Sequence, residues 1–249
     1  MNNLGAFFQT YKNKKATEFV LENYRKHYPD SPVTLISDGG SNFKEISDKY
    51  KCNYIHSFIN LGQPGSQSIK ISSEYQVNPR LAFNKEEAFV WLNRFYQACK
   101  YSVANNSDYI LFLEDDVYIK NKITSLPSSH GFSCGENMDN VINPMLIEYL
   151  EKKYNMIFNV KYYACCGGAI FNARVFVEKY YLILNFLDIE YDIIQAIDYR
   201  TGWLDLYMHI IYYLIGCKYE VNPQFVETWM NVPWDSENYS IVHQYKNLY

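Results

Sequence analysis

One stretch, Asp108 to Ile119, constrains the fold of this chain more than any other. Inside it, an uninterrupted apolar and aromatic run from Tyr109 stops abruptly at Glu114, Asp115 and Asp116. The run is too short for an ordinary helix, so it predicts a strand buried on both faces, as in a parallel sheet covered by helices. Three neighbouring carboxylates at the end of such a strand repel one another unless a positive charge lies among them.

A hard divalent cation, Mn²⁺ or Mg²⁺, is the natural candidate for that charge. Because side chains alternate along an extended chain, we expect Glu114 and Asp116 on one side and Asp115 on the other. A solvated acidic turn is the alternative interpretation, although a turn or a helix cap needs only one acid. We predict that Asp116 is the principal metal ligand and that Glu114 or Asp115 acts directly or through water.

An apolar strand that runs into Glu114, Asp115 and Asp116 resembles the DxD-type motif of GT-A glycosyltransferases. The resemblance implies an α/β fold with a Rossmann-type, mostly parallel sheet flanked by helices. It also implies that the acids hold the cation against the diphosphate of a nucleotide-sugar. Glu114 and Asp116 are then expected to ligate the metal, and Asp115 to face the bound nucleotide-sugar.

The first part of the chain predicts a strand, a helix and a second strand. Leu4 to Gln9 is a short apolar run, and apolar residues then recur at helical spacing until Pro29 ends the pattern. Val33 to Ser37 forms the second run. Such a βαβ unit opens the ends of both strands on one edge of a parallel sheet, where ligands bind.

The turns after these two strands resemble the nucleoside-binding turns of GT-A enzymes, with Gln9 in place of the usual proline. The resemblance implies that Thr10 and Tyr11 contact the base or ribose. It implies that Asp38 accepts a hydrogen bond from a base imide or a ribose hydroxyl. An Asx turn ahead of two glycines is the alternative for Asp38.

The alternation of helices and strands continues to the acidic motif. The predicted segments are a helix at 43–50, a strand at 52–56, a long loop at 57–79 and a helix from 84 to about 103. Arg94, on the last helix, is interpreted as a solvated surface residue, with a phosphate contact as the alternative. After the motif, 117–119 is expected to be extended, 125–137 is polar, and 144–154 predicts a helix.

A glycine-containing segment follows, in which Gly167 and Gly168 separate an aromatic run from a predicted helix at 173–187. Adjacent glycines allow the backbone to approach a ligand closely. The segment resembles the one that lines the junction of donor sugar and acceptor in GT-A enzymes, which assigns both glycines to the bound nucleotide-sugar. A glycine bulge without a ligand is the alternative.

Asp205 lies at the start of a predicted helix that continues to about residue 215. The segment resembles the helix start of inverting GT-A enzymes whose last acid deprotonates the acceptor hydroxyl, although Leu204 replaces the acid that precedes it. The alternative is a first-turn carboxylate favoured by the helix dipole. His209 and Tyr212 share one helical face with Asp205, so His209 is expected to share its proton or hold it in place.

The tail is rich in aromatic residues after a predicted strand at 218–222. It contains His243 at the place where many GT-A enzymes return a histidine to the metal. The resemblance therefore implies that His243 is a metal ligand. An ordinary surface histidine is an equally weighted alternative.

Composition excludes several classes of protein. A net charge of −4 and the absence of a Lys/Arg block argue against a nucleic-acid partner. The six cysteines have no zinc-like spacing and are interpreted as reduced thiols. No transmembrane segment or signal peptide is apparent. We expect a soluble, cytoplasmic protein, with peripheral membrane association left open.

These observations predict one GT-A-like domain of 249 residues, with a nucleotide-binding half at about 1–120 and an acceptor-binding half at about 121–249. The expected activity is metal-dependent transfer of a hexose-like sugar from a nucleoside diphosphate, expected to be UDP, to a hydroxyl of a glycan or glycoconjugate. A catalytically degenerate nucleotide- or glycan-binding protein is the alternative. A haloacid-dehalogenase-type phosphatase is disfavoured because Glu114 stands where its aspartate nucleophile belongs.

Overall fold

The computed structural model describes residues 4–61, 70–71, 74–75, 82–127, 130–131, 141–163, 167–228 and 233–245. Most of the loop predicted at 57–79, most of the polar stretch at 125–137 and three of the six cysteines lie outside these residues. Among the described helices, none is long and apolar enough to cross a membrane.

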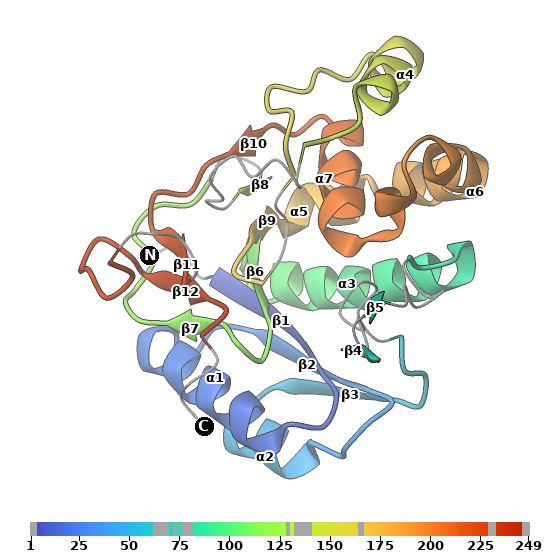
Figure 1. The fold of residues 1–249 in the computed structure, drawn as a ribbon. Helices are drawn as coiled ribbons and strands as arrows, with labels where there is room; N and C mark the ends of the chain where they lie inside the picture. Colours follow the sequence, from blue (N-terminus) through green and yellow to red (C-terminus); the bar gives the residue numbers. More distant parts are fainter. Residues whose placement is uncertain are drawn as a thin grey trace.

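A mixed seven-stranded sheet forms the centre of the molecule (Figure 1). Its order is β10-β8-β9-β6-β1-β2-β3, with β1 (Leu4–Thr10), β2 (Val33–Asp38), β3 (Asn53–Ser57), β6 (Tyr109–Leu113), β8 (His130–Gly131), β9 (Ile170–Asn172) and β10 (Tyr219–Glu220). Strands β6, β1, β2 and β3 are parallel, whereas β9 is antiparallel to both of its neighbours. The expected α/β class with a mostly parallel sheet flanked by helices is confirmed.

Helices cover both faces of this sheet, with α1 on one side and α3 on the other (Figure 1). They are α1 (Lys14–His27), α2 (Lys44–Lys49), α3 (Lys85–Ala104), α4 (Pro144–Tyr154), α5 (Ala173–Glu178), α6 (Tyr180–Ile197) and α7 (Leu204–Leu214), and the short 3-10 helix η2 (Tyr199–Gly202) precedes α7. The helix predicted at 173–187 is therefore two helices. They meet at Lys179, whose ammonium is held 2.8 Å from the carbonyl oxygen of Ile215.

An aromatic cluster fixes α3 against the sheet. Phe7 on β1 meets Trp91 and Phe95 of α3 edge to face, at ring distances of 5.8 and 5.4 Å, and stacks on Phe112 of β6 at 5.5 Å. All four rings are buried, and such pairs stabilise a core beyond their area alone. The cluster therefore holds α3 across the strands whose ends carry the predicted site residues.

Two smaller sheets complete the fold. β4 (Lys70–Ile71) pairs with β5 (Glu74–Tyr75). β7 (Tyr118–Ile119), β12 (Ile241–His243) and β11 (Phe225–Glu227) form a three-stranded sheet in the order β11-β12-β7. The two tail strands were not predicted, because three residues are too few to show a period and their stability comes from pairing with distant segments.

Candidate active site

The three acids after β6 divide as the alternation of side chains predicts. Glu114 and Asp116 belong to one group of side chains, whereas Asp115 is exposed to solvent. The chain turns at this point, because the amide of Val117 donates a hydrogen bond of 3.2 Å to the carbonyl oxygen of Glu114. Val117 itself is buried. The turn thus keeps two carboxylates on the same side while the backbone stays anchored to the core.

The small sheet brings His243 to this turn. Strand β12 runs antiparallel to β7, with Val242 opposite Tyr118. The amide of Tyr245 donates a hydrogen bond of 2.9 Å to the carbonyl oxygen of Asp116. Pairing on both sides of the histidine fixes the register, and a shift by one residue would turn His243 to the opposite face.

His243, Glu114 and Asp116 can hold a divalent metal. Nε2 of His243 lies 3.2 Å from Oε2 of Glu114 and 3.4 Å from Oδ1 of Asp116. These two distances are ones that ligands of one cation at about 2.0–2.2 Å can have, and one donor atom from each of the three residues lies within 4.8 Å of the others. Carboxylate oxygens and an imidazole nitrogen are ordinary metal donors, so the residues present fit a metal.

The glycine segment packs directly against this group. A Cβ atom added at Gly167 would lie 2.5 Å from Oε2 of Glu114. Gly168 has a φ of +89°, and a Cβ atom there would lie 2.5 Å from the ring of Phe225 on β11. The amide of Gly168 also donates a hydrogen bond of 2.7 Å to the carbonyl oxygen of Phe112. Close packing against the acidic turn and the small sheet is thus a sufficient reason for both glycines.

Asp205, in the first turn of α7, lies within the electrostatic field of the same group. The pKa of its carboxyl is raised to about 7, chiefly by burial and then by the charges of Glu114 and Glu227, while the charge of His243 lowers it. Carboxylates close together cannot all ionise at their ordinary pKa values. Asp205 is therefore a carboxyl that titrates near neutral pH beside the candidate metal site.

His209 lies in the core, and so the expectation that it assists Asp205 is not supported. Its side chain is fully buried, with its ring 4.9 Å from that of Tyr213 and 5.2 Å from that of Tyr219. Burial lowers the pKa of the imidazole to about 3, so the ring is neutral. Asp205 and His209 were predicted on one helical face, but α7 is buried at every residue from Leu206 to Tyr213, and the ring contacts of His209 are with aromatic residues of the core.

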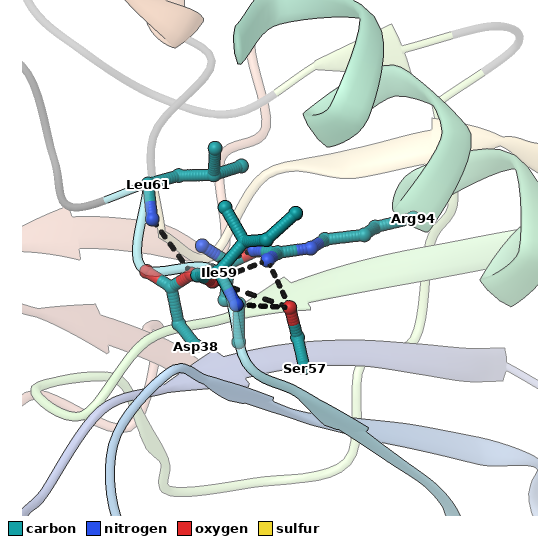
Figure 2. Close-up of polar contacts among 6 residues, drawn as sticks. Asp38, Ser57, Ile59, Leu61 and Arg94 are labelled. Atoms are coloured by element: carbon teal, nitrogen blue, oxygen red, sulfur yellow. Dashed lines mark hydrogen bonds and ion pairs between the residues drawn. The ribbon is translucent and has the colours of Figure 1, made fainter.

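Asp38, at the end of β2, forms a buried ion pair with Arg94 of α3. Nη1 of Arg94 lies 2.7 Å from Oδ1 of Asp38, and both side chains are about 7% exposed or less. Arg94 also donates to Ser57 at 2.6 Å and to the carbonyl oxygen of Ile59 at 2.7 Å, as Figure 2 shows. The amide of Leu61 donates to the same oxygen of Asp38 at 2.9 Å.

The prediction of a solvated surface arginine at position 94 is therefore wrong. Arg94 faces the sheet because the aromatic cluster turns this side of α3 toward the strand ends, where Asp38 compensates its charge. Its guanidinium joins the end of β2 to the backbone that leaves β3 (Figure 2). Asp38 and Arg94 thus hold the start of the 59–61 segment at the edge of the sheet.

Thr10 and Tyr11 differ in what they present to solvent. The hydroxyl of Thr10 lies 2.8 Å from that of Thr17 on α1, and Thr10 is buried. The ring of Tyr11 is 42% exposed, and the ammonium of Lys12 lies 4.6 Å from its centre. The Tyr11 carbonyl accepts a 2.7 Å hydrogen bond from the amide of Ser41. The first turn is thus joined to the second, and of the pair Tyr11 offers the larger surface.

The acidic turn after β6 and the turns after β1 and β2 lie at one edge of the main sheet. Strands β2, β1 and β6 are parallel neighbours, so the turns after them, with Asp38, Tyr11 and Glu114, share the carboxyl edge. Ligands of open parallel sheets bind outside this edge. The structure therefore gathers the residues of the first half at this edge, and the small sheet brings His243, the predicted metal ligand, to Glu114 and Asp116; the alternative of a surface histidine is wrong because His243 is buried.

Glu227 and Arg94 are the polar residues of this region whose positions the sequence did not reveal. Glu227 is 3% exposed, and its Oε1 lies 2.9 Å from Nδ1 of His243. The only local signal is an acid that directly follows two apolar residues, Phe225 and Val226, in a segment without other strand features. Buried acids are rarely left unpaired, but the sequence alone does not name the partner.

Comparison with known proteins gives likeness of fold at low identity. No protein-family model and no curated protein sequence matches the chain. Among solved structures, an active-site mutant of LgtC is similar at 14% identity and a TM-score of 0.47, covering 96% of this chain and 86% of that one. The apo structure of the bifunctional glycosyltransferase WbbM is similar at 12% identity and a TM-score of 0.46, covering 97% of this chain and 45% of that one. At these values the likeness carries no weight for the activity of this chain.

Proposed function

We propose that this protein is a metal-dependent glycosyltransferase that moves a hexose-like sugar from a nucleoside diphosphate, with UDP as the expected carrier, to a hydroxyl of a glycan or glycoconjugate. The observation that carries the proposal is the group of Glu114, Asp116 and His243 at the carboxyl edge of the parallel sheet, beside the turns after β1 and β2. A diphosphate that binds at this edge would need a cation, because Glu114 and Asp116 already place two carboxylates there.

Glu114, Asp116 and His243 would hold the cation. A bound divalent ion would neutralise the negative charge that develops on the leaving diphosphate. Two carboxylates with one imidazole nitrogen suit Mn²⁺ better than Mg²⁺, because Mg²⁺ strongly prefers oxygen ligands and water. Asp115 is exposed next to this group, in a position to contact the nucleotide-sugar. Because it has no side chain, Gly167 would leave room for the carboxylate of Glu114 to lie beside His243. Gly168 would line the site next to it.

The nucleoside would lie over the turns after β1 and β2. Tyr11 is 42% exposed, and its ring would contact the base. Thr10 would support nucleoside binding indirectly, because its hydroxyl forms a hydrogen bond with that of Thr17 and so holds the turn in place. Asp38, which is paired with Arg94, would accept a hydrogen bond from the base or the ribose of the nucleoside. The same ion pair holds the 59–61 segment along this edge.

Asp205 would be the general base that takes the proton from the acceptor hydroxyl. A pKa of about 7 suits a base at neutral pH, because about half of the carboxyls are then ionised and still basic enough to accept a proton. The acceptor would approach from the half of the molecule that carries α4 to α7. A base on the face opposite the leaving diphosphate would make the transfer an inverting one.

The decisive experiment is a transfer and hydrolysis assay with a panel of UDP- and GDP-sugars in the presence of Mn²⁺. We expect release of nucleoside diphosphate that requires both the metal and Asp116. Asp192→Asn on the exposed side of α6 is a matched control. Metal-independent turnover would contradict the proposal. Binding of UDP and Mn²⁺ without turnover of any donor would favour the degenerate binding protein, for which Leu204 in place of an acid is the sequence argument.

A further inference from the structure

We propose that Glu227 is a positioning residue that fixes the imidazole of His243 with Nδ1 protonated and Nε2 turned toward the cation. The inference deepens the proposed function and rests on its metal site. Glu227 lies on β11, 16 residues before the histidine in the chain. No sequence pattern or resemblance assigned it to the site.

The backbone of the small sheet places the two residues opposite each other. In the parallel pairing of β11 with β12, Glu227 is the register partner of His243. The amide of Thr228 donates a hydrogen bond of 3.2 Å to the carbonyl oxygen of His243. Both side chains are at least nine-tenths buried. Their contact is therefore set by strand pairing and is shielded from water, which strengthens it electrostatically.

The hydrogen bond decides which ring nitrogen carries a proton. Nδ1 of His243 lies 2.9 Å from Oε1 of Glu227. An ionised carboxylate can only accept hydrogen bonds, so Nδ1 must donate. Nε2 lies 3.2 Å from Oε2 of Glu114, also within hydrogen-bond distance, and 3.4 Å from Oδ1 of Asp116. The contact of Nδ1 is the shorter of the two hydrogen bonds, so a ring with a single proton carries it on Nδ1, and the lone pair of Nε2 faces the two carboxylates that would share the cation. Glu227 thus leaves Nε2 available for the metal.

Packing around the ring supports the same orientation. The ring of Phe225, two residues before Glu227, lies 6.2 Å from that of His243. Phe225 in turn closes on Gly168, where a Cβ atom would lie 2.5 Å from its ring. A carboxylate that holds the second nitrogen of a metal-bound histidine fixes the tautomer and raises the basicity of the ligand, and its loss weakens metal binding about 10–100-fold.

The test compares Glu227→Gln, Glu227→Leu and the control Glu237→Gln, an exposed glutamate of the same tail. Mn²⁺ affinity is measured by electron paramagnetic resonance titration without any nucleotide. ¹⁵N spectra of histidine-labelled, metal-free protein, at a pH where the ring carries one proton, report the tautomer of His243. Its signal is assigned with His243→Asn. Circular dichroism of each variant confirms the fold.

We expect the Nδ1–H tautomer in the parent protein and in Glu237→Gln. Glu227→Gln should shift the ring toward the other tautomer and weaken Mn²⁺ binding about 10–100-fold, with Glu227→Leu at least as weak. An Nε2–H tautomer in the parent protein would overturn the inference, as would unchanged Mn²⁺ affinity in Glu227→Gln. If the parent protein shows the Nδ1–H tautomer but binds no Mn²⁺, the positioning of the ring stands and the metal-dependent function fails.

Discussion

Asp205 is a carboxyl with a pKa near 7 that interacts electrostatically with two other acids and a histidine, and we propose that it also faces the acceptor. Burial is the largest cause of its raised pKa, and the charges of Glu114 and Glu227 add to it. The first-turn position on α7 favours the ionised form, but burial, together with the neighbouring acids, outweighs it. A plain helix-start carboxylate would not titrate near neutrality.

Asp205→Asn tests this role in catalysis. We expect turnover to fall about 10²–10⁴-fold, as for loss of a general base, while UDP affinity in the presence of Mn²⁺ changes little. The measurement is initial rate against donor concentration, together with nuclear magnetic resonance analysis of the product anomer. A product that retains the donor configuration, or near-normal turnover, would return Asp205 to a structural role.

The same substitution has a predictable effect on stability. A folded-state pKa of about 7 lies above the ordinary aspartate value, so the folded protein holds a proton that the unfolded chain has already lost. Stability of the parent protein therefore falls as pH rises from about 4 to about 7. In EDTA, Asp205→Asn should be matched to the parent at pH 4 and more stable at pH 8, by at most about 4 kcal/mol. Urea denaturation at both pH values checks the sign, and a parallel pH dependence of the two proteins would contradict it.

Among the elements, α3 does more than cover the sheet, because it carries Arg94 to the ends of β2 and β3. Removing one partner of a buried ion pair leaves an uncompensated charge. The pair of Arg174 with Asp108 offers a contrast in the same molecule, at a similar distance of 2.6 Å but with side chains about half exposed. The two ion pairs thus have similar distances but differ in how far solvent reaches them.

We expect Arg94→Ala to lower the free energy of unfolding by about 3–5 kcal/mol. Arg174→Ala, the matched control, should lower it by no more than about 1 kcal/mol, because water screens the exposed pair. Urea denaturation of both variants makes the comparison. Equal losses of unfolding free energy in the two variants would show that the buried ion pair of Arg94 stabilises the fold no more than the exposed pair does. Because Asp38→Ala would leave Arg94 unpaired, nucleoside binding is better tested with Asp38→Asn.

The glycine segment and the acidic turn form a second pair of elements whose contact can be tested. In Gly167→Ala the added methyl would meet Oε2 of Glu114, so the carboxylate must move away from its place. We expect weaker Mn²⁺ binding in a variant that still folds, measured by the same titration. The double variant Gly167→Ala with Glu114→Asp shortens the acid and should recover part of the affinity. Full Mn²⁺ affinity in Gly167→Ala alone would argue against this contact.

At the scale of the whole molecule, the site is assembled from both ends of the chain. The parallel strands supply Tyr11, Asp38 and the acidic turn, and the tail returns to add His243. In Figure 1 the tail strands β11 and β12 lie beside β7, next to the carboxyl end of β6. Under the proposed function, nucleotide and metal should bind as one unit, because a diphosphate at this edge would supply further ligands to the cation.

Thermal unfolding measures this coupling. Mn²⁺ or UDP alone should raise the melting temperature only slightly, whereas the two together should raise it by more than the sum, since a ligand stabilises only in proportion to its binding. Asp116→Asn should abolish the extra shift and leave the ligand-free melting temperature close to that of the parent, because it removes one member of a repelling group. Equal UDP affinity with and without Mn²⁺ in calorimetry would contradict this picture.

The sequence alone determined the elements whose pattern is local and long enough to show a period. The first three strands, α1, α3 and β6 were predicted with nearly correct bounds, and the acidic run fixed the carboxyl edge of β6 as the place of the site. These features depend on burial of a continuous face or a continuous run. Each can be read from neighbouring residues without knowledge of the rest of the chain.

Only the tertiary structure decided which distant side chains complete the site. Glu227 reaches it on a strand of three residues that no sequence pattern predicted. His243 was assigned to the metal by resemblance alone, and strand pairing brings it to Glu114, 129 positions away in the chain. Arg94 is buried and His209 turned into the core because of what packs against their helices, which helical spacing does not reveal. The physical reason is that short strands and buried charges gain their stability from partners far along the chain.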